Sequence, residues 1–357
     1  MKKINFLLPF AGRKPVGGFK VVYEYANRLA ADNYLVKIIY PSSLLFNEQS
    51  TTEKIRSIIK YFYYNIFGRY SCKLWFNLDN RVKEIPVWSL SEAFVPKADI
   101  MICTAVETAG YLAKYKNIAD NHKFYLIQHF EAWYFSEQRV KETYHFPLRK
   151  IVIAEWLADI VHFEGEFCTL IHNGFDFDYF TLATPIESRD RYTFCMLYHV
   201  LEWKGVNDAI KALQIVKDKY PLLKVKMFGA FKRPKFLPDW YDFYTCPDKS
   251  TLNMLYNSSA IFLSASHGEG FCLTPPEAMM CGCALCLTNI GGFTVVAKDN
   301  ENALLSPPHE PEMLAKNLIK LVEDDELRIR LAKEGNRTIK QFTWEKAYIK
   351  LRTLLEN

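Results

Sequence analysis

The sequence predicts an α/β protein with two domains, each built on a doubly wound sheet. The chain has 357 residues, which suits two domains of roughly 150 to 200 residues better than one core. Apolar segments of strand length alternate with amphipathic segments of helix length, as in βαβ units. The alternation restarts after an Asn-Gly turn. We therefore expect domains at 1–172 and 173–341 and a last helix at 342–357.

The composition is that of a soluble globular protein. Half of the residues are hydrophobic and 24% are charged, although the aromatic share of 15% is high. The apolar run after Lys2 and Lys3 is too short for a signal peptide and ends at Pro9. No stretch approaches the roughly 18 apolar residues that span a bilayer. We therefore expect a cytoplasmic protein, and one without a nucleic-acid partner.

The nine cysteines do not form a metal-binding pattern. Cys281, Cys283 and Cys286 are the densest group, but no paired Cys-x-x-Cys or Cys/His knuckle accompanies them. Asp176-Phe-Asp178 has the spacing of a metal clamp, yet it follows an Asn-Gly turn between the two domains. We expect reduced, buried thiols and no metal.

The first half opens with a strand within Met1–Phe10, a basic glycine loop ending at Gly17 and Gly18, and then a helix. Strand, glycine turn and helix form the usual start of a doubly wound unit. The loop lacks Gly-x-Gly-x-x-Gly, so a dinucleotide site is not indicated. The next expected strand is 34–40. Residues 41–91 fit no strand-helix alternation, and we expect them to be irregular.

Regular alternation then resumes. Further strands are expected at 99–103, 124–128 and 150–154, with helices at 107–115 and 155–163. His129 follows the second of these strands. In the second half we expect strands at 192–200, 224–229 and 260–263, helices at 206–220 and 249–257, and tail helices at 310–323, 325–334 and 342–355.

The stretch from Ser264 to Glu277 carries the clearest chemistry. It joins a buried strand to a helix that Pro275 and Pro276 can open, because the first turn needs no backbone donors. Backbone N–H groups at Phe271, Cys272, Leu273 and Thr274, with the positive end of the helix dipole, form an anion site. Glu269 and Glu277 can accept hydrogen bonds from sugar hydroxyls. Alternatively, Glu277 only stabilises the helix start and Glu269 is solvated.

This stretch resembles the signature of the family-four retaining glycosyltransferases of the GT-B fold. It reads Glu269-Gly270-Phe-Cys-Leu-Thr-Pro-Pro-Glu277-Ala278, and the family pattern continues in the small-residue strand before Thr288 and in Gly291-Gly292. The resemblance extends over nearly the whole chain. It implies two Rossmann-like domains facing a cleft, with the C-terminal helix packing back on the N-terminal domain.

The resemblance also implies roles for single residues. Glu277 would hold the ribose of a nucleotide-sugar donor and Glu269 the transferred sugar, while Lys204 would grip the diphosphate. His199 stands where family members usually have arginine, a departure that keeps a non-catalytic protein open. His129 would contact the transferred sugar, or its ring would only form hydrogen bonds with backbone groups. Gly17 and Gly18 would reach the donor phosphates or the acceptor, or form a plain turn.

The function implied is a metal-independent retaining glycosyltransferase of the hexosyl type, with no cofactor. The N-terminal domain would bind a glycan or lipid-linked glycan acceptor of a cell-surface polysaccharide, and the C-terminal domain the donor. Gln128-His-Phe-Glu-Ala-Trp133 resembles a polyrhamnan-building subgroup, which makes dTDP-rhamnose the first expectation for the donor. The alternatives are a nucleotide-sugar epimerase of the same fold and a non-catalytic glycan-binding or partner protein.

Most of the net charge of +5 lies in the irregular region. Residues 51–90 contain seven Lys or Arg and three acids, a balance of +4. Aromatic and β-branched residues are interleaved with the basic ones between Lys54 and Lys83. The segment is either a solvated face over an aromatic core or a peripheral contact with the inner face of a membrane.

Overall fold

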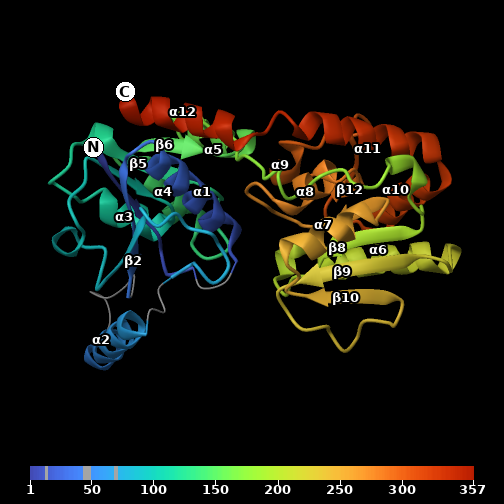
Figure 1. The fold of residues 1–357 in the computed structure, drawn as a ribbon, viewed down its shortest axis with the longest axis horizontal. Helices are drawn as coiled ribbons and strands as arrows, with labels where there is room; N and C mark the ends of the chain where they lie inside the picture. The colour runs from blue at the N-terminus through green and yellow to red at the C-terminus, as the bar shows by residue number, and fades with distance from the viewer. Residues whose placement is uncertain (13–14, 43–49, 68–70) are drawn as a thin grey trace. The chain divides into compact units, whose positions relative to one another are not determined.

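The chain folds into two compact α/β units, which the computed structural model describes for residues 1–12, 15–42, 50–67 and 71–357. Unit 1 comprises Met1–Asn173 and Trp344–Asn357, and unit 2 comprises Gly174–Thr343. Each unit contains one sheet in which every pair of neighbouring strands is parallel (Figure 1). The predicted fold, two doubly wound α/β sheets, is confirmed.

The sheet of unit 1 has seven strands in the order β3-β2-β1-β4-β5-β6-β7. Its strands are short, apolar runs of the kind expected when both faces of a parallel sheet are covered. They are β1 (Lys3–Leu7), β2 (Leu35–Pro41), β3 (Lys83–Val87), β4 (Ile100–Cys103), β5 (Lys123–Ile127), β6 (Arg149–Val152) and β7 (Cys168–Leu170). The helices are α1 (Gly17–Ala31), α2 (Thr51–Ile66), α3 (Val106–Leu112), α4 (Glu137–Tyr144), α5 (Glu155–Phe163) and α12 (Trp344–Glu356).

The prediction that residues 41–91 are irregular was wrong, because α2 and β3 lie there. Ser50 and Glu53 form a capping box, in which each side chain bonds the backbone N–H of the other. Tyr61 in α2 stacks on Trp88 with ring centroids 4.6 Å apart and donates its hydroxyl to the carbonyl of Pro86. One side of α2 therefore packs against the end of β3, an edge strand of the unit 1 sheet.

The last helix completes unit 1, as the fold prediction required. In α12 the ring of Trp344 meets Tyr25 of α1 edge-on, with centroids 5.6 Å apart. The Tyr348 hydroxyl donates to Asp32 at 2.6 Å, and Arg352 also binds this carboxylate. In Figure 1 the red helix α12 accordingly lies beside the blue helix α1.

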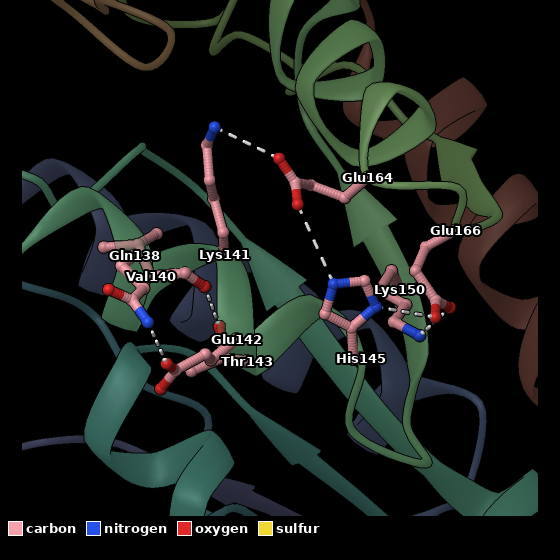
Figure 2. Close-up of polar contacts among 9 residues, drawn as sticks. All are labelled: Gln138, Val140, Lys141, Glu142, Thr143, His145, Lys150, Glu164 and Glu166. Carbon is pink, nitrogen blue, oxygen red and sulfur yellow. Dashed lines mark hydrogen bonds and ion pairs between the residues drawn. The ribbon is translucent and has the colours of Figure 1, made fainter.

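A network of charged side chains ties α4 to β6 and to the turn before β7 (Figure 2). Lys141 pairs with Glu164 at 3.1 Å, and Lys150 pairs with Glu166 at 2.7 Å. His145 lies between the two glutamates, with its Nδ1 atom 3.2 Å from Glu166. Hydrogen bonding to Lys150 lowers the pKa of Glu166 against the opposing effect of burial. The network fixes helix α4, which the sequence did not predict.

The sheet of unit 2 has six strands in the order β10-β9-β8-β11-β12-β13. They are β8 (Thr193–Leu197), β9 (Lys224–Gly229), β10 (Tyr241–Thr245), β11 (Ile261–Ser264), β12 (Ala284–Thr288) and β13 (Ala303–Ser306). The helices are α6 (Val206–Lys219), α7 (Lys249–Asn257), α8 (Thr274–Met280), α9 (Gly291–Thr294), α10 (Pro311–Glu323) and α11 (Asp325–Ile339). A core of aliphatic side chains from the central strands and from α6 and α10 joins the layers.

Candidate functional site

The candidate site of unit 2 lies where the strand order of its sheet reverses. The chain proceeds outward from β8 to β9 and β10, and then returns to place β11 on the other side of β8. In open α/β sheets, ligands bind beyond the carboxyl ends of the strands at such a switch point. His199 and Lys204 follow β8, and Glu269 follows β11. Topology alone therefore brings the two predicted loops together.

Lys204 and Glu269 form a buried ion pair at this point. The Nζ atom of Lys204 lies 2.7 Å from Oε1 and 2.9 Å from Oε2 of Glu269. The Ser266 hydroxyl also donates to Oε1 at 2.9 Å. Only 8% of the Glu269 side chain and 20% of the Lys204 side chain are exposed. The alternative of a solvated Glu269 therefore does not apply.

The two charges stabilise each other in this environment. Burial disfavours the charged form of Lys204, but the Glu269 carboxylate outweighs this effect and raises the pKa of Lys204 above its ordinary value. Lys204 thus carries its positive charge at neutral pH. Both side chains of the pair are largely shielded from water.

His199 lies beside this pair as a neutral imidazole. Burial and the neighbouring Lys204 ammonium lower its pKa, although Glu269 opposes them. The Nδ1 atom accepts the backbone N–H of Leu201 at 3.1 Å, so the neutral ring carries its proton on Nε2. His199 therefore offers one uncharged donor where an arginine would offer a charged fork.

Glu277 lies in the first turn of α8, as predicted. It is half-buried, and its Oε2 atom accepts the Tyr256 hydroxyl at 3.2 Å. The phenol comes from α7, so two helices fix the direction of this carboxylate. Helix α8 has only seven residues, which limits the dipole that the sequence interpretation assigned to its N-terminus.

The residues between Gly270 and Thr274 make the turn into α8 but do not all face outward. The Phe271 ring is buried and stacks on Phe175 at 5.7 Å. Burial raises the pKa of Cys272 to about 12, so this thiol is neutral, and its sulfur contacts the Thr274 hydroxyl at 3.4 Å. Leu273 precedes the first helical residue, Thr274. If Phe271 contacts a nucleotide-sugar, it must therefore do so through its backbone.

Two glycines allow backbone segments to approach the ion pair closely. A Cβ atom on Gly292 would lie 2.3 Å from the carbonyl oxygen of Glu269, and one on Gly205 would lie 1.8 Å from that of Ala265. Gly205 also has a φ of +61°, in the left-handed region that favours glycine. Sequence reasoning missed the roles of Ser266, Tyr256 and Gly205. For Gly205, its place just after Lys204 was the only available signal.

The predicted residues of unit 1 lie at the carboxyl ends of that unit's strands. Its strand order reverses at β1, which has β2 on one side and β4 on the other. Gly17 and Gly18 open α1 beyond β1, and a Cβ atom on Gly18 would lie 3.2 Å from the Gln128 amide. His129 follows β5, and its Nδ1 atom lies 3.1 Å from the Phe130 carbonyl. Arg13 and Lys14 of the basic loop lie outside the described residues.

The structure thus gathers Lys204, Glu269 and His199 into one cluster, with Glu277 at the start of the following helix. Gly17, Gly18 and His129 belong to the other unit. Asp176 pairs with Lys249 at 3.6 Å. Within the described ranges, Asp176 and Asp178 do not join a third metal-ligating side chain.

The fold of the whole chain places it in a structural class. Sucrose-phosphate synthase from Thermosynechococcus elongatus is similar over 100% of this chain and 98% of its own, with a TM-score of 0.74 and 14% identity. HepE from Anabaena, solved with UDP-glucose, is similar over 100% of both chains, with a TM-score of 0.71 and 14% identity. These likenesses concern the fold alone, and they define a glycosyltransferase architecture of the GT-B class.

The sequence match to a known family falls within unit 2, which contains most of the candidate site. Residues 184–338 match the family described as glycosyl transferases group 1. D-inositol 3-phosphate glycosyltransferase from Corynebacterium efficiens is 30% identical over 56% of this chain and 54% of its own. The enzyme of the same name from Corynebacterium glutamicum is 28% identical over 43% and 40%. The chain thus spans about half or less of these relatives.

Proposed function

We propose that the protein transfers a sugar from a nucleotide-diphosphate donor to a glycan acceptor, with retention of anomeric configuration. One observation carries the proposal. The buried Lys204–Glu269 pair and the His199 imidazole are assembled beyond β8 and β11, where the sheet order reverses. This is the position at which α/β sheets bind nucleotides. The group 1 family domain supports the same reading.

Each side chain has a role that its chemistry permits. Lys204 supplies positive charge to the diphosphate, and the Nε2–H of His199 donates a further hydrogen bond. Glu269 keeps lone pairs for a sugar hydroxyl after accepting Lys204 and Ser266. Glu277, oriented by Tyr256, accepts the hydroxyls of the ribose. A water-poor environment strengthens all of these contacts.

The reaction needs no protein nucleophile in this proposal. The bond between the anomeric carbon and the phosphate oxygen breaks, and the acceptor oxygen bonds to the same face of the sugar. The acceptor proton passes to a phosphate oxygen. Lys204 and His199 stabilise the negative charge that develops on the leaving diphosphate.

The donor is proposed in order of preference. The run Gln128–Trp133 supports dTDP-rhamnose first. HepE was solved with UDP-glucose, which makes a UDP-hexose the second choice. A GDP-sugar is the third.

We further propose that unit 1 brings the active site to a membrane-bound acceptor through residues 54–83. Helix α2 exposes an apolar stripe that includes Ile59, with 63% of its surface exposed, and Ile66, with 76%. Arg56 is exposed on the same helix. Apolar and aromatic side chains next to basic ones suit an anionic interface. Among the described residues, none of the helices has the length and apolar character to cross a bilayer.

Nucleotide binding and donor turnover test the transferase proposal together. We expect one of dTDP, UDP or GDP to raise the melting temperature, because a ligand at about 100 times its Kd stabilises by about 2.7 kcal/mol. The matching nucleotide sugar should then be hydrolysed slowly without an acceptor. An epimerised sugar nucleotide as the product would establish the epimerase alternative. Binding without any turnover would establish the non-catalytic one.

A further inference from the structure

Two histidines and one aspartate converge outside the proposed donor contacts. Asp208 lies in the first turn of α6, His267 in the loop between β11 and α8, and His309 in the turn between β13 and α10. One possible ligand atom from each lies within 4.8 Å of the other two. Within the described ranges, no other group of three such side chains is this close. Three separate segments of unit 2 thus meet at one point.

Two of these side chains are already held in place. The His267 Nε2 atom lies 2.8 Å from the Asp208 carboxylate, and 17% of each side chain is exposed. The backbone N–H of His267 donates to the Trp203 carbonyl at 2.7 Å. A Cβ atom on Gly205 would lie only 3.2 Å from Nε2. The ring of His267 is therefore confined between its carboxylate partner and the start of α6.

The third side chain is held by an unusual backbone. His309 has a φ of +64°, a left-handed conformation that is uncommon outside glycine, although asparagine, aspartate and histidine adopt it more often than other residues. Its ring faces that of His267, with centroids 3.6 Å apart and planes inclined by 39°. The turn thus keeps an imidazole against His267 although a glycine would fit the backbone with less strain.

We propose that Asp208, His267 and His309 bind a divalent transition-metal ion of the zinc type. Two imidazoles and one carboxylate form a common three-ligand set for such ions, which leaves a fourth position for water. Bonds of about 2.0 to 2.1 Å place neighbouring ligand atoms roughly 3.4 Å apart. To reach this spacing, the His267–Asp208 pair, now at 2.8 Å, must open slightly, and the exposed His309 must rotate toward it.

The bound ion would link the loop that carries Glu269 to α6 and to the turn before α10. His267 precedes Glu269 by two residues, and Asp208 lies in the first turn after Lys204. The ion is therefore a stabilising clamp on the segments that hold the proposed donor site. It has no assigned step in sugar transfer.

Zinc binding by the full-length protein tests the proposal without any activity measurement. The protein is first stripped with a chelator and then titrated with Zn²⁺ by calorimetry and by thermal melting. His309→Asn is the main variant, because asparagine tolerates the left-handed backbone but has no imidazole. His267→Gln is the second variant. His122→Asn, which removes an exposed histidine of unit 1, is the matched control, and all nine cysteines remain in each protein.

We expect the wild type and His122→Asn to bind one equivalent and to melt about 5 °C higher at saturating Zn²⁺. His309→Asn and His267→Gln should bind at least about tenfold more weakly and lose the shift. Equal binding by the wild type and His309→Asn would place the zinc at other residues and overturn the site. Absence of wild-type binding up to about 100 μM Zn²⁺ would overturn it as well. Neither result bears on sugar transfer.

Discussion

Lys204 cannot be removed without consequences for Glu269. We expect Lys204→Ala to lower transfer by about two orders of magnitude, because it deletes a charged contact to the donor in a shielded site. The variant should also melt at a lower temperature, because a carboxylate that is only 8% exposed loses its counter-charge. Activity assays and thermal melting measure the two effects.

The double variant Lys204→Ala/Glu269→Gln separates those effects. It should recover most of the melting temperature but none of the activity, because a neutral amide needs no counter-charge. Lys211→Ala, an exposed lysine on α6, is the control and should behave as the wild type. Near-normal turnover of Lys204→Ala would remove Lys204 from the donor site.

Variants of His199 test whether a neutral hydrogen-bond donor can replace a charged one at this position. We expect His199→Arg to retain or raise turnover, because a guanidinium would add charge beside the leaving diphosphate. Steady-state kinetics with the matching donor measure this, and His199→Ala should be slower than both. A dead His199→Arg protein with an unchanged melting temperature would mean that the imidazole has a role of its own.

Glu131 makes unit 1 sensitive to pH. Burial raises the pKa of this carboxyl to about 7, although it accepts the backbone N–H of Val106 at 3.0 Å. The folded state therefore holds a proton that the unfolded state releases near pH 4.5, so stability falls as the pH rises from about 4.5 to above 7. Glu131→Gln should reduce this fall by about 1 to 3 kcal/mol. Urea denaturation at pH 5.5 and pH 8 measures it, and equal pH slopes in both proteins would contradict the assignment.

At the scale of the element, we expect α2 to determine whether the protein associates with anionic membranes. We expect sedimentation with anionic liposomes at low salt and much less at high salt, because each basic residue near the surface contributes about 1 kcal/mol. Glu at Lys54, Arg56 and Lys60 should abolish it. The control carries Glu at Lys224, Lys232 and Lys235, three exposed lysines of unit 2, and has the same net charge. Equal sedimentation of the two variants would favour a soluble acceptor.

Elements in the alternating part of the chain could be predicted because buried parallel strands are continuous apolar runs. Helix α2 could not, because its apolar residues occupy both the side against Trp88 and the exposed side, which obscures the period of 3.6. The capping box at Ser50 and Glu53 was the available signal. Strand β3 was missed because Lys83, Glu84 and Pro86 interrupt its apolar pattern.

For the whole molecule, the proposed transfer should be independent of metal ions. We expect EDTA to leave turnover at 20 °C unchanged. In the proposed site, the positive charge of Lys204 and the hydrogen bond from His199 stabilise the diphosphate in place of a divalent cation. The same treatment should lower the melting temperature if the Asp208–His267–His309 clamp holds an ion. Turnover that is lost in EDTA and restored by Mn²⁺ would place a metal in the reaction instead.

The two loops of the candidate site could be predicted because their sequences carry a signature, but their contact could not. Lys204 and Glu269 are 65 residues apart, and only the order of β8 and β11 in the sheet makes them neighbours. The same holds for Tyr256 and Glu277, which lie on different helices. Periodicity assigns elements, whereas the order of strands in a sheet depends on packing over the whole unit.

The position of α12 has a consequence for the order in which the chain can fold during synthesis. Tyr25 and Asp32 of unit 1 can form their contacts with Trp344 and Tyr348 only late in synthesis. Trp344 and Tyr348 leave the ribosome after every residue of unit 2. Unit 2 is continuous in sequence and can close first, while α1 keeps an uncovered side. Synthesis of unit 1 begins first and ends last, so a nascent chain stopped before Trp344 contains all of unit 2 but lacks the helix that completes unit 1.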